Sequence, residues 1–144
     1  MTILAAMLKP SQADSAALSV TDATVALCKA SGDPLRLQVL RVLSRDAYGV
    51  LELSQIFDVR QSALSHHLKV LATAGLVVTR REGNSIFYRR ALKSLMAETE
   101  ALQAAIYATA DRLELEAALQ DRILTVRNER SQQSLEFFTR NSDQ

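Results

Sequence analysis

Hydrogen-bonding side chains gather on one side of the stretch from residue 60 to residue 73, and no acid interrupts them. At the turn of an α-helix, about 100° per residue, they share one face and its flank. The face carries Ser62, His66, Lys69 and Thr73, and the flank carries Gln61 and Ser65. Ordinary solvated faces mix Glu with Lys, because opposite charges one turn apart attract. Hydroxyl, amide, imidazole and ammonium groups without carboxylates suit the base edges and phosphates of a nucleic acid.

The elements around this face are predicted from the neighbouring residues. The opposite side of the stretch carries the apolar residues Leu64, Leu68 and Leu71, the buried stripe of an amphipathic helix. Residues 50–57 read as a shorter helix with an inward apolar side, and residues 58–60 form a turn between the two. Two helices joined by such a turn are the helix-turn-helix unit, whose second helix enters the major groove of DNA. Gly75 is predicted to end the second helix.

A basic β-hairpin is expected directly after the second helix. Residues 76–81 and 85–90 are β-rich runs, and Glu82-Gly83-Asn84 between them is a hairpin signal. A hairpin in this place is a wing, which can follow the DNA backbone or enter the minor groove. Tyr48 and Val50 are expected to add a short edge strand to the sheet of the wing.

Capping residues mark the two helices that precede this unit. Thr21 or Asp22 can cap a helix that runs to about Ala30. Asp33 is a good N-cap for the next helix, because Pro34 then takes the first helical position, where its missing N–H costs nothing. That helix is expected to end near residue 45. Its cations Arg36, Arg41 and Arg45 are expected to be solvated rather than bound to phosphate.

Positive charge is concentrated in the predicted DNA-reading region, although the net charge of the 144 residues is only +1. Residues 60–93 carry seven Lys or Arg and one Glu, whereas residues 1–59 and 94–144 have net charges of −1 and −4. Such a basic region on a nearly neutral protein favours binding to a polyanion. A basic surface that arose by chance is the alternative, and its coincidence with the helix and the hairpin argues against it.

Four ordered motifs resemble the ArsR/SmtB-type winged-helix repressors. They are Gly32–Leu37, Gln61–Leu71, Ala74–Val77 and Arg80–Gly83. The resemblance covers roughly residues 21–92 and implies a homodimer that represses transcription and releases its operator when an effector binds. Arg60 stands where this family usually has a helix-capping Ser. Because a guanidinium cannot accept the capping hydrogen bonds, we expect Arg60 to reach a phosphate instead.

The expected contacts with double-stranded DNA divide between bases and phosphates. Base readers would be Gln61, Ser62, Ser65 and His66. Phosphate or minor-groove contacts would come from Lys69, Arg80 and Arg81, with Asn84 and Ser85 at the tip of the wing.

The metal-binding residues of the founding sensors are absent. Aligned on Glu52-Leu53, their two cysteine positions are Gly49 and Leu51, so the resemblance implies no arsenic, lead or cadmium site there. The family's other metal site needs a histidine on the helix after the wing, and residues 92–113 contain none.

No other residues suggest a metal site or catalysis. His66 and His67 lie about 100° apart on a helix and cannot easily chelate one ion. His67 is predicted to be structural, and Cys28 is predicted to pack in the core. The chain has no glycine-rich phosphate loop and no nucleophile with a base in a motif, so neither an enzyme nor a cofactor is expected.

Long helices are predicted after the wing, because no glycine or proline follows Gly83. Two helices with a bend near Ala110-Asp111 are favoured over a single rod. A heptad-like seam runs through Leu92, Leu95, Thr99, Leu102, Ile106, Thr109 and Leu113. Within the seam the predicted dimer contacts are Leu92, Leu95, Leu102, Ile106 and Leu113, assisted by the N-terminal helix as in the family. A second stripe contains Leu115, Leu119, Ile123 and Val126.

The end of the chain has a resemblance of its own. Residues 126–138 are similar to the linker of fusion proteins in which such a repressor domain precedes an S-adenosylmethionine-dependent methyltransferase domain. S-adenosylmethionine or S-adenosylhomocysteine is therefore a candidate effector. Because the apolar stripe ends at Val126 and Leu135, Phe137 and Phe138 are the next apolar residues, deletion of residues 128–144 is expected to be mild.

The sequence thus predicts a mainly α fold with a small β-hairpin wing. Its parts are an arm at residues 1–20, a winged helix-turn-helix domain at 21–92, and a C-terminal helical dimerisation region and tail at 93–144. No run approaches the ~20 apolar residues of a membrane span, and a single cysteine fits a reducing cytoplasm. We expect a cytoplasmic, homodimeric repressor of an inverted-repeat operator. The alternatives are a protein-interaction module with a vestigial helix-turn-helix, and the regulatory part of a methyltransferase system.

Overall fold

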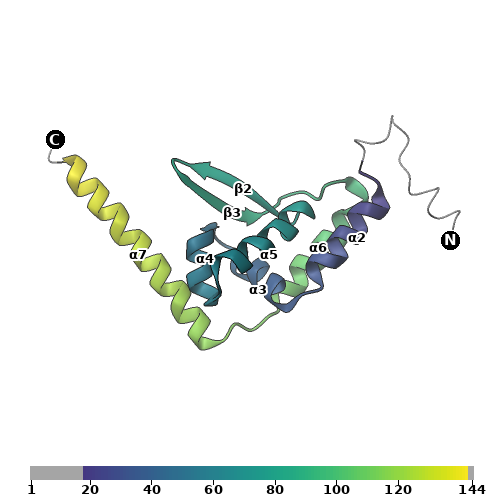
Figure 1. The fold of residues 1–144 in the computed structure, drawn as a ribbon, viewed down its shortest axis with the longest axis horizontal. Helices are drawn as coiled ribbons and strands as arrows, with labels where there is room; N and C mark the ends of the chain where they lie inside the picture. The colour runs from purple at the N-terminus through teal and green to yellow at the C-terminus, as the bar shows by residue number, and fades with distance from the viewer. Residues whose placement is uncertain (1–17, 143–144) are drawn as a thin grey trace, which may run out of the picture.

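The computed structural model describes the backbone of residues 18–142 and the side chains of residues 18–133. Its elements are α2 (Val20–Ser31), α3 (Pro34–Val42), β1 (Tyr48–Gly49), α4 (Val50–Phe57), α5 (Gln61–Thr73), β2 (Val77–Glu82), β3 (Ser85–Arg90), a 3-10 turn (Ala97–Thr99), α6 (Glu100–Asp111) and α7 (Ala117–Ser142). Figure 1 shows α3, α4 and α5 between the pair α2 and α6 on one side and α7 on the other. The predicted fold class, mainly helical with a small β-hairpin wing, is confirmed. The predicted arm lies outside the described residues up to residue 17, as do the side chains of the tail from residue 134.

The first two helices begin at hydrogen-bonding caps. The hydroxyl of Ser19 accepts from the Asp22 N–H at 3.0 Å, so α2 begins slightly earlier than the predicted caps Thr21 and Asp22 would allow. Asp33 caps α3 as predicted and accepts from the Arg36 N–H at 3.0 Å. This hydrogen bond lowers the pKa of Asp33, because it is made to the ionised carboxylate. The helix ends at Val42, short of the predicted residue 45.

The wing is an antiparallel sheet in the order β1-β3-β2. The strands β2 and β3 pair from Val77↔Arg90 to Glu82↔Ser85, which leaves a two-residue turn. Gly83 occupies its first position with φ 60°, a conformation that glycine adopts without strain. The predicted edge strand is present as β1, although it is Tyr48–Gly49 that pairs with β3, and Val50 already begins α4.

The core is centred on the apolar side of α5. Its Leu64, Leu68 and Leu71 are fully buried, as predicted, and α2, α3 and α4 all contact this helix. Gly75 follows the end of α5 with φ 76°, which confirms its predicted role. A Cβ atom at Gly75 would also come within 2.6 Å of the Leu95 side chain, so the close packing of the next segment requires glycine here.

The chain after the wing forms two helices with a break after Asp111, close to the predicted bend. The predicted seam is nevertheless wrong as a continuous helical stripe. Leu92 and Leu95 precede the helix, and Leu92 is 86% exposed. Ile106 is only 7% exposed, because the face of α6 that it shares with Gln103 and Ala110 packs on its own chain, on α2 and α3. Ile106 is therefore a core residue rather than a dimer contact.

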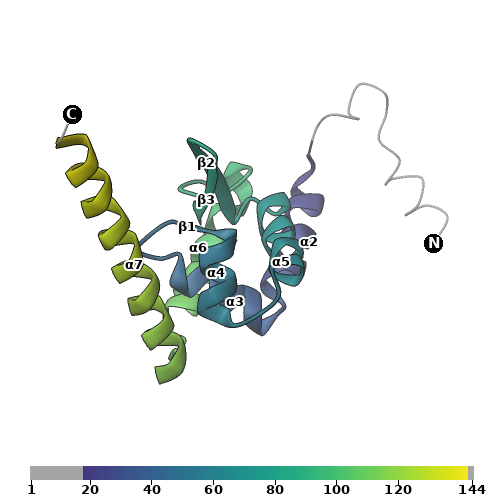
Figure 2. The same cartoon turned by 60° about the vertical axis from the view of Figure 1, so that its left-hand side comes forward.

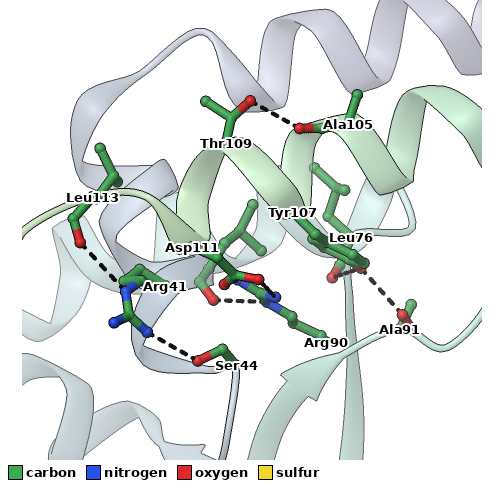
Figure 3. Close-up of polar contacts among 11 residues, drawn as sticks. Arg41, Ser44, Leu76, Arg90, Ala91, Ala105, Tyr107, Thr109, Asp111 and Leu113 are labelled. Atoms are coloured by element: carbon green, nitrogen blue, oxygen red, sulfur yellow. Dashed lines mark hydrogen bonds and ion pairs between the residues drawn. The ribbon is translucent and has the colours of Figure 1, made fainter.

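Polar contacts fix α6 to the base of the wing (Figure 3). Arg90 of β3 donates from Nε to the Leu40 carbonyl at 2.8 Å and forms an ion pair with Asp111 at 2.7 Å. Its guanidinium also lies 4.7 Å from the centre of the Tyr107 ring. The Tyr107 hydroxyl is 2.7 Å from the Leu76 carbonyl, and burial raises the pKa of Tyr107 to about 12, so it stays a donor. One arginine thus joins β3, α3 and α6.

The last helix, α7, packs along α4 (Figure 2). Leu119 and Val126 are buried in this contact, as the second apolar stripe predicts. Arg122 donates to the Ile56 carbonyl at 2.6 Å, and Arg130 bonds to Glu52. The expectation that little depends on the chain beyond Val126 is therefore wrong, because Arg130 lies beyond it and contacts the helix-turn-helix.

The ion pair between Arg90 and Asp111 predicts a pH dependence of folding. The hydrogen bond from Arg90, followed by its positive charge, lowers the pKa of Asp111 below the usual 3.8. Because the pKa is lower in the folded state, the stabilisation is complete above 3.8 and is lost as the pH falls through the folded value. Asp111→Asn should reduce the free energy of unfolding at pH 7 by up to about 1 kcal/mol and make it less sensitive to acid. Chemical denaturation between about pH 7 and pH 2 measures both effects.

Asp121→Asn is the matched control, because Asp121 is exposed and its side chain has no partner among the described residues. It should follow the wild type at every pH. If Asp111→Asn also followed the wild type, the ion pair would contribute nothing to stability.

Candidate nucleic-acid interface

The hydrogen-bonding face predicted from the sequence lies on the solvent side of α5. Its exposed residues are Gln61, Ser62, Ser65, His66 and Lys69. Each points away from the core because the leucines on the opposite side of the helix are buried. The structure thus leaves these groups available to a ligand. Their contacts with DNA stay predictions.

The turn before α5 fixes the direction of this helix. Asp58 adopts the left-handed conformation with φ 53° at the end of α4. The hydroxyl of Ser54 donates to the Val59 carbonyl at 2.6 Å, and the Ser54 carbonyl accepts from the Val59 N–H at 3.2 Å. Ser54 thus holds both polar groups of Val59 and locks the predicted three-residue turn.

The N-terminus of α5 is open to solvent. Arg60 is the N-cap residue, and no side chain within the described part of the protein caps this helix. The first amides of a helix have no partner inside it and carry the positive end of its dipole, so they favour an anion. The exposed Arg60 beside them has the right charge to bind the same anion, which supports its predicted contact with phosphate.

His67 has a structural contact, as predicted, whereas its neighbour His66 is exposed. Arg36 of α3 lies with Nη1 3.0 Å from His67 Nδ1. Because a guanidinium only donates, Nδ1 accepts, and the neutral ring carries its hydrogen on Nε2. Arg36 also donates to the carbonyls of Ala30 and Lys29 at 2.7 and 3.0 Å. The prediction that Arg36 is solvated is therefore wrong, because this side chain joins α2 to α5.

Two further predictions about single residues are wrong. Arg41 is not solvated, because it donates to the Leu113 carbonyl and to Ser44, both at 3.4 Å. Cys28 is exposed on α2 instead of packing in the core, because its side chain projects away from the face that buries Leu27. Arg45 is exposed, as expected.

The wing presents its basic residues to solvent. Arg80, Arg81, Asn84 and Ser85 are all exposed. Arg80 forms an ion pair with Glu82 at 3.3 Å, but both side chains are more than half exposed. Such surface pairs contribute little, so Arg80 can exchange its carboxylate partner for a phosphate.

A groove of about 760 Å³ joins the two predicted DNA-contacting elements. It is lined by Gln61 at the start of α5, by Asn84 and Ser85 of the wing, and by Glu129 and Arg130 of α7, among others. Gln61 and the tip of the wing are thus brought together as predicted. Sequence reasoning missed α7 as the third wall, because Arg130 and Glu52 are 78 positions apart and no local pattern connects them.

No three His, Cys, Asp or Glu side chains within the described part of the chain are placed to hold a metal ion. Among the helices of that part, none is both long and apolar enough to cross a membrane.

Comparison with known proteins identifies relatives of this arrangement. The family described as "Bacterial regulatory protein, arsR family" matches residues 33–79, from α3 into β2. A biofilm growth-associated repressor of Agrobacterium fabrum is 40% identical over 87 residues, which are 60% of this chain and 74% of that protein. The transcriptional activator HlyU of Vibrio cholerae is 41% identical over 78 residues, which are 54% of this chain and 72% of that protein.

A solved structure extends the similarity to the fold. It is the homodimeric winged helix-turn-helix DNA-binding domain of a possible ArsR-family transcriptional regulator from Mycobacterium bovis. The two chains share 28% identity with a TM-score of 0.52, and the match covers 75% of this chain and 94% of that one.

Proposed function

Because the chain belongs to the arsR family of bacterial regulatory proteins, we propose that it is a sequence-specific DNA-binding regulator of transcription. The observation that carries the proposal is the exposed, acid-free face of α5 beside a basic wing. The relatives include both a repressor and an activator, and repression is the sign proposed here, as the resemblance of the motifs implies.

In the proposed complex α5 enters the major groove and the wing follows the backbone or enters the minor groove. Gln61, Ser62, Ser65 and His66 face base edges, which offer both donors and acceptors to amide, hydroxyl and imidazole groups. Phosphate contacts come from Arg60, Lys69, Arg80 and Arg81, with Asn84 and Ser85 at the tip of the wing. The open N-terminus of α5 supports this arrangement, because its amides favour a phosphate.

The first test of the proposal separates phosphate contacts from base contacts. Lys69→Ala should weaken binding to all DNA sequences and reduce the slope of log K against log salt by about 0.9, the value for one phosphate. Gln61→Ala or His66→Ala should instead relax base preference, at about 1–3 kcal/mol for each specific base pairing removed. Fluorescence anisotropy with a selected operator and with random duplexes, over a range of salt concentrations, measures both quantities.

Arg45→Ala is the control, because Arg45 is exposed and has no partner within the described residues. It should bind DNA as the wild type does. Wild-type binding that ignores salt concentration would overturn the proposal and favour the alternative of a protein-interaction module.

The proposed assembly is a homodimer on an inverted-repeat operator. Support comes from the homodimeric relative and from an exposed face shared by α2 and α6, which pack side by side. Its exposed residues are Val25, Cys28, Ala101, Ala105 and Ala108. Small side chains let two helix pairs approach closely. Of the predicted contacts Leu92, Leu95, Leu102 and Leu113 remain proposed at the edges of this face, and Ile106 is excluded by its place in the core.

Ala105→Glu tests the dimer without disturbing the core. It should place like charges against each other across the two-fold axis and shift the protein to a monomer in sedimentation velocity. Operator affinity should then fall steeply, because the second half-site contact is no longer intramolecular. Ala118→Glu on α7, an equally exposed position, should leave the dimer intact. A dimeric Ala105→Glu variant would move the interface elsewhere.

Release by a small-molecule effector is the last part of the proposal. The groove beside the wing has a volume within the range of small-molecule sites, and the tail resembles the linker of methyltransferase fusions. S-adenosylmethionine or S-adenosylhomocysteine at 100 times its Kd should raise the free energy of unfolding by about 2.7 kcal/mol and lower operator affinity. A thermal-shift series with these compounds and with divalent metals measures this. A shift with zinc or cadmium alone would replace the proposed effector with a metal.

A further inference from the structure

We propose that Arg130 of α7 is a positioning residue that sets the angle of the wing relative to α5. The inference rests on the proposed function, because the angle matters only if both elements contact the same DNA. It concerns a residue outside the matched family segment, which ends at residue 79.

Arg130 reaches three segments of the chain with one guanidinium. Its Nε donates to Glu52 Oε2 at 3.0 Å, and Nη2 donates to the Ala47 carbonyl at 3.1 Å. The same group lies 5.0 Å from the centre of the Tyr48 ring of β1 and 5.6 Å from the Phe87 ring of β3. Burial disfavours its charge, but the hydrogen bond to Glu52 and the nearby carboxylates outweigh this and raise the pKa of Arg130.

The carboxylate that Arg130 holds also begins the helix-turn-helix. Glu52 Oε1 accepts from the Gly49 N–H at 2.9 Å, which closes the N-terminus of α4. Gly49 is at the same time the second residue of β1 and pairs with Phe87 of β3. The start of α4 and the edge of the wing sheet are therefore one junction, and Arg130 contacts both of its parts.

The helix that carries Arg130 is itself fixed. Arg122 donates to the Ile56 carbonyl at the far end of α4, and Val126 between the two arginines is only 2% exposed. Because Arg122 contacts the end of α4 and Arg130 its start, α7 runs antiparallel to α4. In Figure 2, α7 passes beside both α4 and β1. The guanidinium therefore cannot follow the wing, and the wing must follow the guanidinium.

The wing needs such a support because its own attachment is small. Its edge strand β1 has only two residues, and a two-stranded ribbon is marginally stable without further packing. Removal of the Arg130 guanidinium should loosen the pairing of β1 with β3 and let the hairpin swing. Arg80 and Arg81 of the wing would then meet phosphates less often, while α5 would still read bases.

Arg130→Gln tests this idea, with Arg127→Gln as the matched control. Arg127 is exposed on the same helix, and its side chain has no hydrogen bond or ion pair within the described part. In Arg130→Gln the salt slope should fall by about 0.9 for each phosphate that the wing no longer neutralises, with the base preference retained. Arg130→Lys keeps the charge but not the planar fork and should fall between Gln and the wild type. It also serves as the second variant if Gln prevents folding.

Two readouts distinguish positioning from general stability. In an Arg80→Ala/Arg81→Ala background, Arg130→Gln should cause no further decrease of the slope, because its effect passes through the wing. Amide hydrogen exchange at Gly49 and Phe87 should accelerate at least tenfold in Arg130→Gln, while amides of α5 stay protected. Equal slopes and equal exchange for Arg130→Gln and Arg127→Gln would overturn the inference. Wild-type protein that binds no DNA would overturn the proposed function, and the exchange data would still decide whether Arg130 supports the wing.

Discussion

The buried leucine stripe of α5 is the constraint on which the rest of the structure depends. With Leu64, Leu68 and Leu71 fully inside, the period of the helix fixes the direction of every other side chain on it. Three helices pack on the apolar side and none covers the polar one within the described residues. The amide, hydroxyl and imidazole groups therefore have no internal partners to satisfy. They are held in place by a core to which they contribute nothing, as a reading surface requires.

The features that could be predicted from the sequence act over a few residues. Asp33 with Pro34 and the glycines at 75 and 83 each specify a local backbone conformation, and the structure has all three where they were expected. The periodicity of residues 61–73 is equally local, because neighbours on a helix face are three or four positions apart. The start of α2 was misplaced for the same reason. Ser19 and Thr21 both carry hydroxyls that can cap, and only the backbone geometry selects between them.

The wrong predictions concern contacts between distant segments. A spacing of three and four residues shows that Ile106 lies on a helix face, but it cannot tell a partner chain from α2 and α3 of the same chain. Likewise Arg36 and His67 are 31 positions apart, and neither residue type reveals the other. Cys28 illustrates the opposite error, because cysteine is usually buried but the face of α2 on which it falls was not determined by composition.

The arginines show why net charge alone could not define the interface. Arg36, Arg90 and Arg122 each donate to a carbonyl in the last turns of a different helix, at Ala30, Leu40 and Ile56. Such carbonyls lack partners within their helix and carry the negative end of its dipole, so a guanidinium from another element binds them well. These side chains are thereby committed to the fold. Arg60, Arg80 and Arg81 have the same chemistry but no helix end within reach that holds them, and they remain exposed. The cations available to a polyanion are therefore those that the packing of the helices leaves unused.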